Sequence, residues 1–206
     1  MELTFPQKDA LTELINIGYG RAAAALSELT GYRVNLEVPQ VAIHKIEAVA
    51  PVLETMLGAS VASVNQRFSG PVSGNALLLL DEASALVLGR LLSENGGSST
   101  EFDSNAREII TEVGNILLNA CLGVFGNLLH IQVNFAVPQL YVGTVPRLLQ
   151  SVGQNAAEPM QFGLMIHTRF SVKTGDVAGF LVIVLGIASL DRLLQKLVEW
   201  ESRQLQ

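Results

Sequence analysis

Hydrophobic residues recur every three or four positions along two long segments, about residues 7–30 and 104–128. This period places apolar side chains on one face of a helix, so the sequence predicts two long helices. Gly31 is suited to end the first helix, and Asp103 or Ser104 to cap the start of the second. The repeated apolar positions are Leu11, Leu14, Ile15, Ala22 and Leu26 in the first segment and Ile109, Val113, Ile116, Leu117 and Ala120 in the second.

A short apolar stretch with alternating character follows each predicted helix. Residues 33–38 and 131–137 are interpreted as strands, and a proline comes directly after each, Pro39 and Pro138. Proline has no N–H to donate to a sheet ladder, so both strands are expected to end there.

Each half of the chain continues with a predicted hairpin and a closing helix. The hairpins pair about 58–68 with 73–80 and 160–171 with 176–186, and the helices cover about 81–94 and 187–203. The segment 140–158 contains proline and glycine without a clear period, and we expect an irregular excursion there. The glycine- and serine-rich stretch 94–100 is expected to be a linker between the halves.

Short sequence words recur in the same order in both halves. ELIN at 13–16 returns as EVGN at 112–115, which is 99 positions later. RFS at 67–69 and RLL at 90–92 each return 102 positions later. Several words in one order at nearly one offset favour an internal repeat.

We therefore predict one α/β (α+β) domain over residues 1–206, with internal repeats of about 1–98 and 99–206. Each repeat would contain a helix, a strand, a hairpin and a helix, and the two would be related by a pseudo-twofold axis. The sheet is expected to be mixed or antiparallel, with the long helices packed on it.

Each long helix carries a line of acidic and amide residues, because positions i, i+4 and i+7 share one face. The two lines are Asp9, Glu13 and Asn16, and Glu108, Glu112 and Asn115. For a single copy, the simplest interpretation is the solvated face of an amphipathic helix. The recurrence of the same spacing favours a function over simple solvation. Asparagine is also a mediocre helix former, so its presence inside both helices points the same way. An amide can hold and orient a water molecule, as required in phosphoryl-group hydrolysis.

Composition excludes several other classes of function. Of the 206 residues, 49% are hydrophobic and 16% charged, with a formal charge of −6 and no basic run, which argues against nucleic-acid binding. The single Cys121 permits no intrachain disulfide, and the longest apolar run, 177–190, is too short to span a bilayer. We expect a cytoplasmic protein without membrane insertion. The histidines lie far apart, so no metal site is expected: His44, His130 and His167.

The two polar lines resemble a known motif. The pattern Asp/Ser-x3-Glu-x2-Asn-x22-Pro is typical of the CheC, CheX and FliY group of phosphatases, which act on the chemotaxis response regulator CheY. The motif's four positions are Asp9, Glu13, Asn16 and Pro39 in the first copy and Glu108, Glu112, Asn115 and Pro138 in the second. Two copies in a chain of this length resemble CheC in particular. The second copy departs from the pattern, because it opens with glutamate instead of aspartate or serine.

This resemblance implies a mechanism with two sites. Glu13 or Glu112 would contact the active-site lysine of a phosphorylated CheY-like regulator, and Asn16 or Asn115 would align water for attack on its aspartyl phosphate. Mg²⁺ would belong to the regulator, so no cofactor is expected in this chain. CheD would be a possible further partner.

Two other functions remain open from the sequence. The chain could be a non-catalytic binding or adaptor protein for phosphorylated CheY or a CheD-like partner, or a structural component of a flagellar switch. Gly18 and Gly20 add an unexplained feature, since glycine inside a helix costs about 1 kcal/mol relative to alanine. Their position beside the first polar line suggests that another part of the protein packs very close there.

Overall fold

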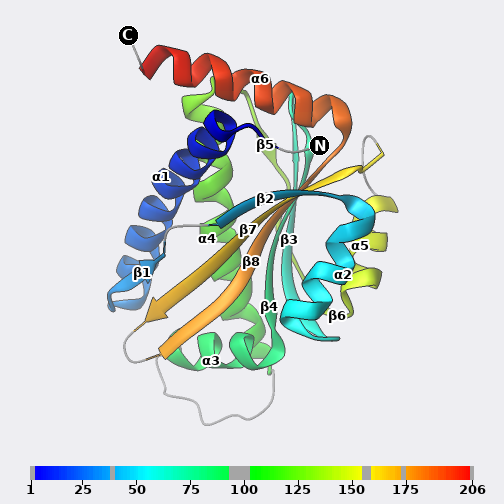
Figure 1. Ribbon diagram of the computed structural model, residues 1–206. Coiled ribbons are helices and arrows are strands. Elements are labelled where there is room, and N and C mark those ends of the chain that lie inside the picture. Colours follow the sequence, from blue (N-terminus) through cyan, green and yellow to red (C-terminus); the bar gives the residue numbers. More distant parts are fainter. Residues whose placement is uncertain (1–2, 38–39, 93–102, 155–158, 173–174, 205–206) are drawn as a thin grey trace.

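The computed structural model describes residues 3–37, 40–92, 103–154, 159–172 and 175–204 (Figure 1). These residues form six helices and eight strands, and the order helix, strand, strand, helix, strand, strand, helix occurs twice. The first series is α1 (Phe5–Thr30), β1 (Val34–Leu36), β2 (Gln40–Lys45), α2 (Ile46–Leu57), β3 (Val61–Ser69), β4 (Gly74–Asp81) and α3 (Glu82–Leu92). The second is α4 (Ser104–Leu128), β5 (Asn134–Phe135), β6 (Gln139–Gly143), α5 (Val145–Gln154), β7 (Phe162–Val172), β8 (Gly175–Leu185) and α6 (Ile187–Gln204).

All strands join one antiparallel sheet in the order β1-β7-β8-β4-β3-β5. β2 also pairs with β7, and β6 also pairs with β3. If each strand is replaced by its counterpart in the other series, β1 by β5, β3 by β7 and β4 by β8, the same strand order is obtained in reverse. β4 pairs with β8 at the centre. The mixed α/β single domain is therefore confirmed. The predicted boundary between the repeats and the linker 94–100 lie outside the described residues.

Helices cover both faces of the sheet (Figure 1), and a hydrophobic core lies on each face. The larger core lies under α1, α3, α4 and α6, and the smaller one under α2 and α5. β4 is buried on both faces: Leu78 and Leu80 face the larger core, while Leu77 and Leu79 face the smaller one. This burial explains why β4 is a continuous apolar run instead of an alternating one.

The ends of the long helices follow local sequence signals. Thr4 caps α1 through a capping box with Gln7, and Gly31 ends it at φ 67°. The Asp103 side chain caps α4 by accepting a hydrogen bond of 2.8 Å from the backbone N–H of Ala106. The predicted caps Gly31 and Asp103 are thus confirmed.

Helix α4 has the length and apolar composition of a membrane-spanning helix, but half of its most apolar stretch is buried inside the molecule. Its inward side chains belong to the larger core, where they pack with α1 and the sheet. Cys121 and Leu117 are among these buried residues. Packing in the core accounts for the hydropathy of this helix.

The prediction of an irregular excursion over 140–158 was wrong, because β6 and α5 occupy most of it. Pro146 is the second residue of α5, where its missing N–H costs no hydrogen bond. Val145, Leu148 and Val152 recur at helical spacing and are buried in the smaller core. The corresponding β2 and α2 of the first half were not predicted either, and Pro51 inside α2 obscured that helix.

Candidate functional site

The two motif helices, α1 and α4, lie side by side on one face of the sheet and run in opposite directions (Figure 1). They approach each other closely where Gly18 faces Cys121: a Cβ on this glycine would lie 2.9 Å from the Cα atom of Cys121. Gly20 has open space around it, with no heavy atom within 4 Å of an added Cβ. The expectation of close packing therefore holds for Gly18 and fails for Gly20.

The polar lines face outward from this helix pair. All four acidic residues are exposed, and both asparagines, Asn16 and Asn115, are half-buried. The acidic residues are Asp9, Glu13, Glu108 and Glu112. The apolar residues predicted on the opposite faces are buried or partly buried in the larger core.

The two lines form separate sites. Asn16 lies two residues before Gly18 on α1, and Asn115 lies six residues before Cys121 on the antiparallel α4. At a rise of 1.5 Å per residue, the two amides are about 12 Å apart along the helix axes. Neither amide can therefore contact a small group held at the other.

Helix α4 approaches the sheet closely beside its motif. A Cβ on Gly114 would lie 2.5 Å from the Cβ of Val64 on β3, so this position accepts only glycine at the present spacing. The neighbouring Asn115 is consequently held close to β3. Sequence periodicity contains no signal for this contact, which depends on a strand far away in the chain.

Asn115 is the end of a chain of amide groups. Asn119 Nδ2 donates a hydrogen bond of 2.6 Å to Asn115 Oδ1. Gln66 Nε2 donates at 3.1 Å to Asn119 Oδ1 and at 3.1 Å to the backbone carbonyl of Ala136. Gln66 is 2% exposed and lies on the face of β3 that carries Val64.

The sequence reasoning missed Gln66 and Asn119, although each left a signal. Asn119 lies four residues after Asn115 and therefore shares its helix face. Gln66 interrupts the inward alternation of Ala62, Val64 and Phe68 with a polar side chain.

Of the two motif prolines, the structure describes Pro138. Pro138 is half-buried between β5 and β6, two residues after Ala136, whose N–H donates to Arg67 O and whose carbonyl accepts from Gln66. The segment that contains Pro138 thus also anchors the amide chain behind Asn115. Pro39 lies outside the described residues.

The first site is built differently behind its asparagine. Gly20 occupies the position four residues after Asn16, so no side chain there can donate to the Asn16 amide. Thr168 lies 102 positions after Gln66, the offset of the repeated words, and its hydroxyl donates to the hydroxyl of Tyr19. Both of these side chains are buried.

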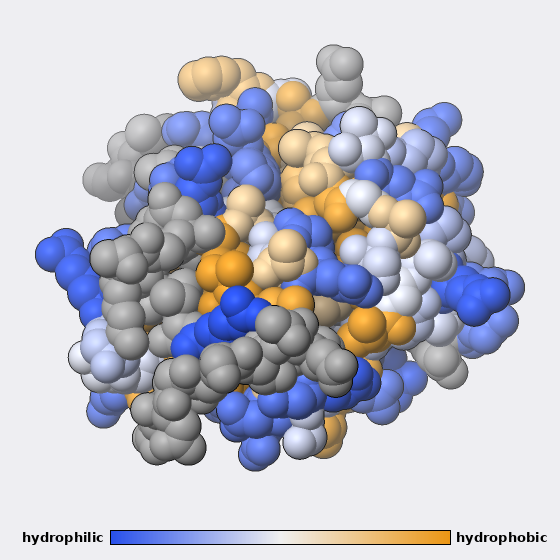
Figure 2. Space-filling view, turned by 90° about the horizontal axis from the view of Figure 1, so that it is seen from below, coloured by the Kyte–Doolittle hydropathy of each residue, from blue (hydrophilic) through white to orange (hydrophobic). Residues whose placement is uncertain are grey.

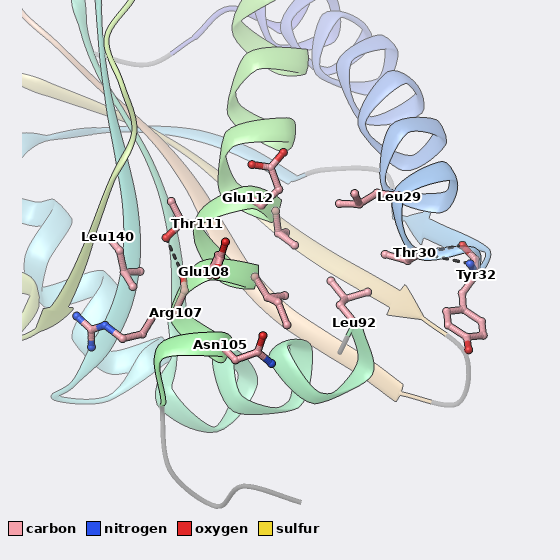
Figure 3. A pocket seen from close by; sticks show the side chains of 12 residues that line it. Leu29, Thr30, Tyr32, Leu92, Asn105, Arg107, Glu108, Thr111, Glu112 and Leu140 are labelled. Atoms are coloured by element: carbon pink, nitrogen blue, oxygen red, sulfur yellow. Dashed lines mark hydrogen bonds between the residues drawn. The ribbon is translucent and has the colours of Figure 1, made fainter. Parts of the chain in front are cut away.

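A cavity of about 980 Å³ opens beside the acidic residues of the second site. Glu108 and Glu112 line it from α4, with Leu29 and Thr30 of α1 on the other wall and Leu92 of α3 below (Figure 3). Figure 2 looks onto this end of the molecule and shows apolar patches set among polar side chains. The carboxylates of the second motif thus stand at the edge of a partly apolar hollow.

The charges of the motif are not neutralised within the described part of the chain. Both ion pairs found there lie elsewhere, Glu37 with Arg169 and Glu199 with Lys196. No group of three or more metal-binding side chains occurs among the residues that the structure describes. The exposed carboxylates can therefore pair with a cation on another molecule.

Residues 7–43, which include the first motif, match the sequence model of the CheC-like family. The CheY-P phosphatase CheC of Bacillus subtilis is 28% identical over 65% of this chain. A putative CheY-P phosphatase, CheC1 of Halobacterium salinarum, is 27% identical over 63%. These matches support a relation of the chain to the CheC family. The matches span 65% and 66% of the length of these two relatives.

Solved structures share the fold of this CheC-like chain. Thermotoga maritima FliY superposes with a TM-score of 0.76 at 20% identity, covering 99% of this chain and 100% of that one. The FliM middle domain of H. pylori gives 0.65 at 10% identity, covering 94% and 99%. CheX in the CheX–CheY–BeF3–Mg complex of Borrelia burgdorferi gives 0.50 at 17%, covering 82% and 96%. Because FliY, FliM and CheX share this fold, the fold alone does not choose a function.

Proposed function

We propose that this CheC-like chain is a phosphatase for a phosphorylated CheY-like response regulator. The observation that carries the proposal is the display of Glu-x-x-Asn on the outward faces of two helices, with each asparagine one turn beyond its glutamate. The relatives named CheY-P phosphatase and the complex of CheX with CheY support the same assignment. A cytoplasmic location and a CheD-like second partner belong to this proposal.

This chain contributes to the reaction by positioning its helix on the regulator and by orienting the attacking water. Glu13 or Glu112 pairs with the lysine ammonium of the regulator and thereby sets the register of the helix on its active site. Asn16 or Asn115 then enters that site and accepts a hydrogen bond from water, so that a lone pair of the water faces phosphorus. The water oxygen bonds to phosphorus as the bond to the aspartate oxygen breaks, which releases inorganic phosphate and the aspartate carboxylate. Mg²⁺ is supplied by the regulator, and this chain needs no cofactor of its own.

The test is the decay rate of a cognate phosphorylated CheY with wild type, Asn16→Ala, Asn115→Ala and the double variant. Misplacing an attacking group typically costs about 100-fold in rate, so the double variant should lose nearly all acceleration. Asn127→Ala is the matched control, because Asn127 is an exposed asparagine on α4 outside the motif.

Binding to a BeF3-activated regulator separates catalysis from docking, since BeF3 stands in for the phosphoryl group. Retained binding with lost hydrolysis supports the positioning mechanism. If wild type binds the activated regulator and leaves its phosphate decay unchanged, the chain is a binding or adaptor protein and the phosphatase proposal is wrong.

A further inference from the structure

We propose that Gln66 and Asn119 are positioning residues of the second site, which set the orientation of the Asn115 amide. This inference rests on the proposed phosphatase function for its catalytic consequence. The structural part, a chain of hydrogen bonds with a defined direction, stands on contacts within the protein.

A backbone carbonyl sets the direction of the amide chain. The Ala136 oxygen can only accept, so the Gln66 group that faces it at 3.1 Å must be the Nε2 amine. The second hydrogen of this amine goes to Asn119 Oδ1. Asn119 therefore turns its own amine to Asn115 Oδ1, at 2.6 Å. A flip of any one amide would place two acceptors or two donors against each other.

The consequence is a fixed orientation of Asn115. Its oxygen lies on the Asn119 side, and no partner for its Nδ2 amine occurs among the described residues. A carbonyl oxygen has two lone pairs, so Oδ1 can still accept one hydrogen bond from water while Nδ2 donates to a phosphoryl oxygen. One amide in this orientation contacts both the attacking water and the group under attack.

The buried position of Gln66 favours a role beyond packing for this polar side chain. Gln66 is 2% exposed, and its Oε1 has no hydrogen-bond partner within the described part of the protein. A buried acceptor without a partner disfavours folding, and an apolar side chain on this face of β3 would avoid that penalty. The other inward residues of the strand, Ala62, Val64 and Phe68, are apolar.

The first site lacks an equivalent donor on its helix. Gly20 stands where Asn119 stands in the second site, and the pair of Thr168 with Tyr19 takes the place of the contact made by Gln66. The orientation imposed by Asn119 therefore belongs to the second site, and the test must measure that site alone.

The decisive variant is Asn119→Asp in an Asn16→Ala background, which leaves the second site as the active one. The substitution keeps the size of the side chain and its acceptor for Gln66, but replaces the amine that faces Asn115 by oxygen. Two facing acceptors would turn the Asn115 amide around. Losing one hydrogen bond to an oriented group corresponds to a fall in kcat of about 3- to 10-fold, with KM unchanged. Asn127→Asp in the same background adds the same charge to α4 and should leave kcat unchanged.

A second measurement does not depend on activity. In the NMR spectrum, Asn115→Ala should shift the side-chain amide signals of Asn119, because their hydrogen-bond acceptor is removed. Unshifted Asn119 signals overturn the amide chain, and an unchanged kcat for Asn119→Asp overturns its role in catalysis. If wild type itself does not hydrolyse the phosphorylated regulator, the proposed function fails, and the NMR result alone decides whether the amide chain exists.

Discussion

Replacing Gly18 and Gly20 separately by alanine should change the free energy of unfolding in opposite directions. Both glycines lie inside α1, so each substitution gains about 1 kcal/mol of helix propensity. Around Gly20 no heavy atom lies within 4 Å of the added Cβ, and the whole gain should appear as stabilisation.

At Gly18 the added Cβ would lie 2.9 Å from the Cα of Cys121, which is a backbone atom and cannot rotate away. Helices α1 and α4 must then move apart, and overpacking of this kind costs about 1–3 kcal/mol. The net effect is a loss of about 1 kcal/mol, which separates the two variants by about 2 kcal/mol.

Urea unfolding followed by circular dichroism measures this difference. With a slope of about 2 kcal/mol per molar urea, Gly18→Ala should unfold about 1 M below Gly20→Ala. The Gly20→Ala variant is the control for helix propensity at nearly the same place. Equal midpoints for the two variants would refute the close approach of α1 and α4.

Three further predictions concern buried groups and a helix cap. Burial raises the pKa of the Cys121 thiol above its usual range, so a thiol reagent at pH 8 should label it only on unfolding. The thiol ionises at a lower pH in the unfolded chain than in the folded protein. The free energy of unfolding measured by urea titration should therefore be constant with respect to this group below about pH 8 and fall as the pH rises further. Tyr19→Phe leaves the buried Thr168 hydroxyl without its partner, and thermal unfolding should show a loss of about 1–3 kcal/mol. Asp103→Ala removes the acceptor for the Ala106 N–H and should cost about 1 kcal/mol, which Asp103→Asn should largely restore.

The two sites differ in how each asparagine is held, and this bears on the substitution of Glu108 for the usual aspartate or serine. The sequence favours the first site, since its motif is complete. In the structure, the second site has the amide chain through Asn119, whereas Gly20 provides no such donor to Asn16. Measuring the rates of Asn16→Ala and Asn115→Ala side by side shows which contributes more to activity, the complete motif of the first site or the hydrogen-bonded amide of the second.

Local periodicity by itself determined the long helices, their caps at Gly31 and Asp103, and the outward polar lines. Helix spacing and capping depend on residues within a few positions of one another, so the sequence carries that information directly. The two hairpins were predicted for the same reason, and the structure places them as β3 with β4 and β7 with β8.

Tertiary structure alone decided the contacts between distant segments. Strands were expected at β1 and β5, but their partners β7 and β3, which come from the other half of the chain, were not. Helices α2 and α5 were not expected, and they form because they cover the second face of the sheet. The roles of Gln66 and Gly18 follow from the same cause. Each depends on which residue lies opposite across an interface, a relation that local pattern does not contain.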